Sequence, residues 1–178
     1  MKKIFIVALS FVFLGALSAG AQTIESLFVQ TRTIQASGKK VVSEGTFSFT
    51  APDQLAMLYT KPDGDYIIID GPFVRTMTKG TEVNLDTRSN AQAKKLSSTL
   101  LNCITGNYKQ VAEDNDGELS VSEKGGVKTV TIKARKPAPR GYSGVTVKYR
   151  KDGTATEMTL DEFGGISTHY LLKDIQRK

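Results

Sequence analysis

Cysteine and histidine are almost absent from this chain, in which Cys103 and His169 are the only residues of their types. One cysteine cannot form an internal disulfide, and protein zinc sites need several cysteine or histidine ligands. We therefore expect no metal and no cofactor. Cys103 is expected to be a small, buried, apolar residue.

The single histidine also argues against catalysis. Ser–His–Asp chemistry needs a histidine base with a matching nucleophile, and no nucleophile motif accompanies His169. The residue falls in a strand pattern, so it points outward if its neighbours Tyr170 and Leu172 point inward. We predict that the protein is not an enzyme.

Charge is scarce in the first twenty-one residues, which follow the pattern of a secretory signal peptide. A positive start at residues 1–3 is followed by an apolar run over residues 4–17 and by the small-residue cleavage signal Ala19-Gly20-Ala21. The run is short for a membrane span, which needs about 20 apolar residues. Cleavage is expected before Gln22, and because no cysteine stands there, no acylation is expected.

Residues 22–178 are long enough for one domain with a sizeable core. Without Lys2 and Lys3 the formal charge falls from +6 to +4. Export makes nucleic acid an improbable partner, whereas acidic membranes or acidic proteins remain possible partners. We expect a monomer.

Alternation of apolar and polar residues dominates the rest of the chain and predicts short antiparallel strands joined by tight turns. Phe47 and Phe49 share one face of a strand that Pro52 ends. The Asp70-Gly71 pair is typical of a tight hairpin turn. The expected strands follow one another as a meander over residues 27–34, 41–50, 55–60, 66–69, 73–78, 118–123, 127–134, 145–150, 154–160 and 166–172.

One segment has helical spacing instead. From Asn90 to about Thr105 the apolar residues fall on one side, with Ser89 or Asn90 as the amino-terminal cap and Gly106 as the end. A lone amphipathic helix in a β chain must cover something apolar, and the concave face of a curved sheet is the natural partner. The apolar residues of this helix are Ala93, Leu96, Leu100, Leu101 and Ile104.

The helix and the sheet together predict either a filled core or an apolar cleft. Core packing explains most of the apolar residues, but a helix that does not fill the concavity leaves a cleft for apolar ligands. Met77 would suit varied chains, because methionine is flexible. The candidate ligand-binding residues are Phe47, Phe49, Leu58, Ile68, Met77, Val130 and Ile132 on the sheet and Leu96, Leu100, Leu101 and Ile104 on the lid.

Two charged segments have alternative interpretations. Residues 112–123 partly match a calcium loop, but Ala112 stands where the first carboxylate belongs, which favours a solvated turn. The basic residues Lys133, Arg135, Lys136 and Arg140 flank a proline-rich loop. They form either a solvated loop or a cationic rim for a lipid headgroup or an acidic partner.

The order of these motifs resembles the periplasmic outer-membrane lipoprotein carrier family, LolA. The resemblance spans nearly all of residues 22–178. The helix at residues 90–105 corresponds to the family's helical lid, and Ala51 replaces an arginine of well-studied carriers, so no arginine role is carried over. The matching stretches are residues 44–52 (EGTFSFTAP), 59–64 (YTKPDG), 66–71 (YIIIDG), 151–154 (KDGT) and 165–172 (GISTHYLL).

The resemblance implies a mainly β fold with one or two helices, an unclosed antiparallel β-barrel with a helical lid over its concave face. It implies a periplasmic carrier that shields the acyl chains of lipoproteins or other amphiphiles in transit to the outer membrane. An inner-membrane transporter and an outer-membrane receptor would be its exchange partners. The alternative is an envelope sensor or protein-interaction module on the same fold, without lipid cargo.

Overall fold

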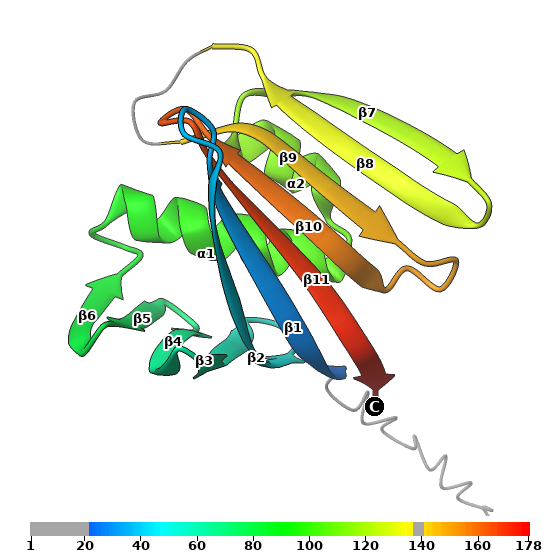
Figure 1. Ribbon diagram of the computed structural model, residues 1–178. Coiled ribbons are helices and arrows are strands. Elements are labelled where there is room, and N and C mark those ends of the chain that lie inside the picture. Colours follow the sequence, from blue (N-terminus) through cyan, green and yellow to red (C-terminus); the bar gives the residue numbers. More distant parts are fainter. Residues whose placement is uncertain (1–21, 137–140) are drawn as a thin grey trace, which may run out of the picture.

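The computed structural model describes residues 22–136 and 141–178, and these form one antiparallel sheet of eleven strands with two helices (Figure 1). The predicted signal peptide lies outside the described residues. The elements are β1 Thr23–Ile34, β2 Lys39–Thr50, β3 Gln54–Lys61, β4 Asp63–Asp70, β5 Phe73–Thr78, β6 Thr81–Asp86, α1 Ala91–Thr105, α2 Tyr108–Asp114, β7 Gly117–Lys124, β8 Val127–Ala134, β9 Tyr142–Tyr149, β10 Ala155–Glu162 and β11 Ile166–Arg177.

The sheet consists of two meanders that meet at β1 and β11, rather than one meander in sequence order. The strand order is β6-β5-β4-β3-β2-β1-β11-β10-β9-β8-β7. β1 pairs with β2 on one side and with β11 on the other, with Phe28 opposite both Gly45 and Leu172. The first and last strands therefore form the middle of the sheet, and β6 and β7 form its edges.

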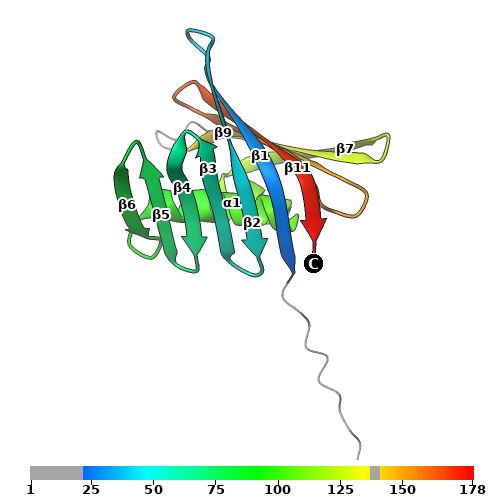
Figure 2. The same cartoon turned by 60° about the horizontal axis from the view of Figure 1, so that its bottom comes forward.

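This order explains why the helices lie across the concave face. α1 follows β6 at one edge and α2 precedes β7 at the other, so their connection must cross the curved sheet from edge to edge. Figure 2 shows α1 behind the strands of the first meander. The open half-barrel with a helical lid is thus confirmed.

The observed boundaries of α1 agree with those predicted from the sequence. The Oδ1 atom of Asn90 accepts a hydrogen bond from the Ala93 N–H at 2.8 Å and caps α1. Gly106 ends the helix with a φ of 76°, a left-handed conformation that glycine adopts without strain. Neither helix of the described part is long and apolar enough to span a membrane.

Two elements were not predicted. α2 is a helix of seven residues whose Val111 and Ala112 are buried, and it packs against β7 and β8. β6 pairs with β5 and has only half-buried or exposed residues. Both are short, and neither has a strong periodic pattern.

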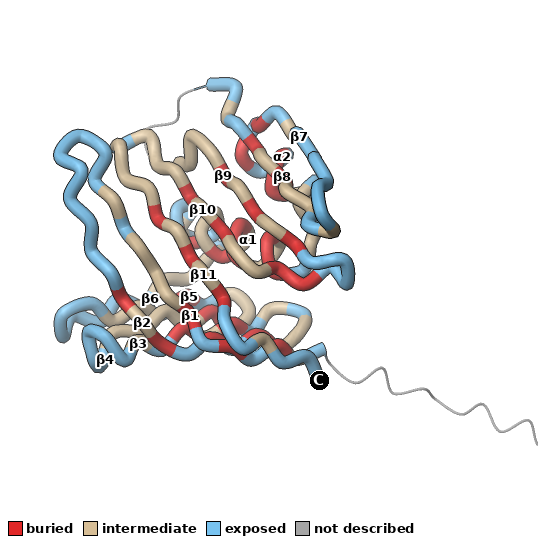
Figure 3. The backbone as a smooth tube through the Cα atoms, turned by 45° about the vertical axis from the view of Figure 1, so that its right-hand side comes forward, coloured by how far each residue is buried: buried red, intermediate tan, exposed pale blue. Residues whose placement is uncertain are grey.

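Apolar side chains alternate along the strands so that one side of each faces the helices. Figure 3 shows the buried segments in the strand interiors and the exposed ones mainly toward the hairpin ends. The buried residues form one cluster that includes strands from both meanders and both helices. The two halves of the sheet therefore share a core under the helices.

Candidate functional site

The interface between α1 and the sheet is the apolar site that the fold creates. Leu100, Cys103 and Ile104 are buried on α1. Leu100 and Ile104 face a cavity of about 10 Å³, which admits about one water molecule. The interior is therefore nearly filled by side chains. The cavity is lined by Phe47, Leu55, Met57, Leu100, Ile104, Ala155, Glu157, Met158, Tyr170 and Leu172.

Six of the predicted site residues lie at this interface or in the core beside it. Phe47, Leu100 and Ile104 line the cavity. Phe49, Val130 and Ile132 are buried in the same cluster. Their role in holding a ligand stays a prediction.

The two remaining lid residues are only partly buried. Leu96 and Leu101 pack against the core cluster without entering it. Leu96 also borders a second hollow of about 330 Å³ between the first half of α1 and the ends of β9 and β10. This hollow is lined by Gln92, Lys95, Leu96, Gly141, Tyr142, Glu162 and Gly164.

Three predicted sheet residues, Leu58, Ile68 and Met77, lie on the wrong face. Leu58 is 46% exposed, and it pairs with Tyr66, which pairs in turn with Met77. Directly paired residues share a face, and a strand's side chains alternate with a period of two. Since Leu55 and Met57 point to the concave side, Leu58 points to the convex side, and Ile68 and Met77 follow it.

The alternation of side chains along the strands also identifies concave residues that were not predicted. Leu55 and Met57 lie opposite Phe49 and Phe47, and Ile69 continues the row from Leu55. All are at most 4% exposed. Extending the face of Phe47 and Phe49 across the following hairpins would have found them.

Polar groups hold the second half of α1 to the sheet. The hydroxyl of Tyr149 in β9 donates a hydrogen bond to the Cys103 carbonyl oxygen at 2.8 Å, in a buried position. Burial raises the pKa of the Cys103 thiol to about 12 and also raises the pKa of Tyr149. Tyr108 of α2 lies against Tyr149, with ring centroids 6.3 Å apart. The end of α1 and the start of α2 thus share one anchor.

Polar residues also interrupt the buried side of α1. Ser97 and Thr99 are both buried. The Thr99 hydroxyl has no hydrogen-bond partner among the described residues. Burying an unpaired hydroxyl costs about 1–3 kcal/mol, so this part of the interface is weaker than an apolar one would be.

The convex face has a charged cluster that includes the single histidine. Tyr170 and Leu172 are buried, so His169 points outward, as the alternation predicts. Glu157 accepts a hydrogen bond from Lys148 at 2.9 Å and lies 3.4 Å from the His169 ring. Lys148 and His169 do not line the cavity, whereas Glu157 forms part of its lining.

The other charged segments have ordinary surroundings. In the described part of the chain, no group of acidic, histidine and cysteine residues could hold a metal, which includes the calcium-like stretch at residues 112–123. Arg135 pairs with Asp116 at 3.2 Å. Arg140, part of the proposed cationic rim, lies outside the described residues.

Fold and interior together define a class of protein, an open antiparallel half-barrel whose apolar concave face is covered by a helix. The chain belongs to the LolA family, since the family model of the outer membrane lipoprotein carrier protein LolA matches residues 19–178. The resemblance predicted from the sequence is thereby confirmed. Comparison with curated proteins gives no match.

Several solved structures are similar to this chain over most of its length. A LolA superfamily protein of Nitrosomonas europaea is 6% identical, with 86% of this chain and 85% of that one covered and a TM-score of 0.38. The MucA/MucB complex of Pseudomonas aeruginosa is 14% identical, with 88% and 52% covered and a TM-score of 0.45. The lipoprotein LppX of Mycobacterium tuberculosis is 12% identical, with 88% and 87% covered and a TM-score of 0.35. The family assignment rests on the sequence match.

Proposed function

We propose that this protein is a periplasmic carrier that shields the acyl chains of lipoproteins or of similar amphiphiles. The observation that carries the proposal is the apolar interface between α1 and the sheet, which extends over both meanders. Each buried CH₂ group contributes about 0.8 kcal/mol, so an acyl chain gains from replacing water with such a surface. Membership of the LolA family supports the same role.

Carriage requires α1 to move, because the cavity of about 10 Å³ cannot hold an acyl chain. The buried hydrogen bond from Tyr149 and the packing of α2 hold the end of α1, whereas its start borders the larger hollow. Opening therefore hinges near Cys103 and separates the first half of α1 from the sheet. Ser97 and Thr99 on the buried side favour such opening, because they weaken the closed interface.

The proposal also covers the protein's localisation and its mechanism. The predicted signal peptide at residues 1–21 would direct the chain out of the cytoplasm, and Gln22 would begin the mature protein. Binding and release of an apolar ligand need no catalytic residue, cofactor or metal. A transporter that loads the carrier and a receptor that unloads it are the expected partners.

The test is binding of a fluorescent fatty acid to purified protein. Leu100→Asp places a charge in the cavity wall and should weaken binding at least about tenfold, since burying an unpaired charge is costly. The matched control is Leu58→Asp, on the exposed convex face, which should bind normally. Unchanged binding in Leu100→Asp would contradict the assignment of the cavity.

A second variant covers the case in which Leu100→Asp does not fold. Met57→Trp fills the cavity with an apolar side chain and should also reduce binding, while thermal unfolding checks that the fold is kept. Normal binding by this folded variant would place the ligand elsewhere.

The nearly filled interior favours one alternative, a protein-interaction module without lipid cargo. Native mass spectrometry of protein from an envelope extract separates the two functions. A co-purifying lipid or lipoprotein that Leu100→Asp loses supports the carrier. A mass without ligand, together with no uptake of added fatty acid, supports the interaction module.

A further inference from the structure

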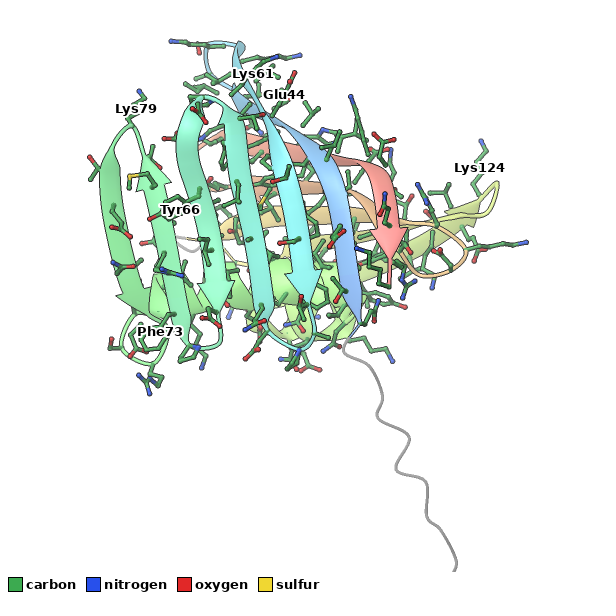
Figure 4. The ribbon with its side chains drawn as sticks, turned by 90° about the horizontal axis from the view of Figure 1, so that it is seen from below. Glu44, Lys61, Tyr66, Phe73, Lys79 and Lys124 are labelled. Carbon is green, nitrogen blue, oxygen red and sulfur yellow. The ribbon has the colours of Figure 1, made fainter. Side chains whose placement is uncertain are left out.

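The hairpin formed by β1 and β2 extends beyond the neighbouring strand β3. β2 pairs with β3 only from Glu44, which lies opposite Lys61, to Thr50. Residues 39–43 of β2 pair with β1 alone. Figure 2 shows this hairpin end projecting past the other strands of its meander, and Figure 4 shows Glu44 and Lys61 at the level where β3 ends.

The end of this hairpin, residues 30–43, is cationic; it projects past β3, while residues 30–34 of β1 still pair with β11. It contains Arg32, Lys39 and Lys40 and no acidic residue. None of the three cations forms an ion pair within the described residues. The nearest acidic residue along β2, Glu44, already pairs with Lys61 at 3.1 Å. The three charges are therefore available to an anionic surface.

The same segment exposes large apolar side chains on both of its faces. Val41 is 50% and Val42 is 57% exposed, and Ile34 is also exposed. Val41 lies opposite Arg32 and Val42 opposite Thr31, so the two valines point to opposite sides of the ribbon. Burying one face against a protein would leave the other valine in water.

We propose that the end of the β1–β2 hairpin inserts into the interface of an anionic phospholipid bilayer. A bilayer interface can cover both faces and the open β2 edge of the hairpin end, so it can bury Ile34, Val41 and Val42 together while the headgroups meet Arg32, Lys39 and Lys40. Lysines on an open strand edge oppose pairing with another strand, which argues against a second chain as the occupant. The proposal does not depend on the carriage of acyl chains.

Binding to vesicles by sedimentation tests the proposal, with a chain that starts at Gln22, because residues 4–17 would themselves bind lipid. The described fold lies within this chain. Vesicles containing phosphatidylglycerol should bind the protein, and vesicles of phosphatidylcholine alone should bind it far less. Lys39→Gln with Lys40→Gln should weaken binding by about 30-fold, since each lysine near an anionic surface contributes about fivefold.

The β7–β8 hairpin supplies a matched control. Its end, marked by Lys124 in Figure 4, also has exposed valines, Val121 and Val127, and the lysines Lys124 and Lys128. Lys124→Gln with Lys128→Gln removes the same total charge and should leave binding nearly unchanged. Equal losses in both double variants would show general charge attraction and overturn the proposal, as would no binding by the unaltered protein.

A second readout tests insertion of the apolar residues. The chain has no tryptophan, so one introduced residue provides the tryptophan signal. Val41→Trp fluorescence should shift to shorter wavelength when phosphatidylglycerol vesicles are added, and Val121→Trp fluorescence should not. A shift in Val121→Trp alone, or in neither variant, would contradict insertion of the β1–β2 hairpin.

Discussion

At the scale of single residues, Gly45 shows how close packing fixes a position in the middle of the sheet. An added Cβ would lie 2.7 Å from the Phe28 ring and closer still to the Leu58 carbonyl group. The space above Gly45 is occupied by Phe28, which meets Tyr59 edge to face with ring centroids 5.1 Å apart. Glycine is needed here for the close approach of the Leu58 carbonyl group and the Phe28 ring, and its motif in the sequence did not reveal that reason.

Replacement of Gly45 by alanine should destabilise the protein by about 1–3 kcal/mol, the usual cost of overpacking a filled core. Urea unfolding of the variant measures this directly. Gly164→Ala is the control, because an added Cβ there meets nothing within 4 Å. A loss of stability in the control equal to that of Gly45→Ala would show that the cost does not come from the close contacts with Leu58 and Phe28.

Glu157 links stability to pH. The hydrogen bond from Lys148, with a smaller contribution from His169, lowers the pKa of the Glu157 carboxyl below its usual value of 4.5. A lowered native pKa stabilises the fold above pH 4.5, and this stabilisation is lost as the pH falls through the native pKa. The ion pair is partly exposed, so its contribution is less than about 1 kcal/mol.

Glu157→Gln should therefore lower stability slightly at pH 7, and the difference from the unaltered protein should disappear in acid. Urea unfolding across the pH range gives both values. Glu118→Gln removes a carboxylate that has no ion pair among the described residues and serves as the control. A difference for Glu157→Gln that persists after the carboxyl is protonated would mean that the charge is not its cause.

At the scale of elements, the lid is held unequally at its two ends. Tyr149 bonds the carbonyl group of Cys103 near the end of α1, and α2 packs on β7 and β8 directly after it. The thiol of Cys103 is fully buried beneath the helix. Its modification by a thiol reagent therefore reports how often α1 leaves the sheet.

Tyr149→Phe removes only the hydroxyl group and should speed modification of Cys103 by a few-fold to tenfold, since a buried hydrogen bond contributes about 1 kcal/mol. The rate of reaction with an aromatic disulfide reagent measures this effect. Tyr66→Phe, which removes a hydroxyl that bonds Glu82 on the convex side, is the control. An unchanged rate in Tyr149→Phe would show that the hydrogen bond from Tyr149 does not hold α1 to the sheet.

The sequence predicted most of the strands and α1, but for some strands it did not predict which face points toward the helices. Strong turn pairs and regular alternation revealed the hairpins, and the caps located α1 within a residue. For Leu58 the prediction failed because residues 55–59 are apolar on both faces, so the pattern alone left the register open by one residue. α2 was missed because seven residues make less than two helical turns, and β6 because it has only two apolar residues, Val83 and Leu85.

At the scale of the whole molecule, the pairing of distant strands could not be read from local patterns. Alternation identifies strands and turns identify neighbours, but nothing in β1 or β11 alone indicates that they pair. The family resemblance implied the half-barrel, and only the structure shows the seam, the pairing of β1 with β11. The nearly filled interior also depends on how side chains from both meanders meet, which a pattern along one strand does not determine.

The seam between β1 and β11 has a consequence for synthesis. Gln30 and Tyr170, hydrogen-bonded across it, are 140 residues apart in sequence. Closing so long a loop is slow, and until the last strand is made, β1 presents an unpaired edge in the middle of the future sheet. A chaperone that covers β1 during this interval would protect the nascent protein at its most vulnerable point.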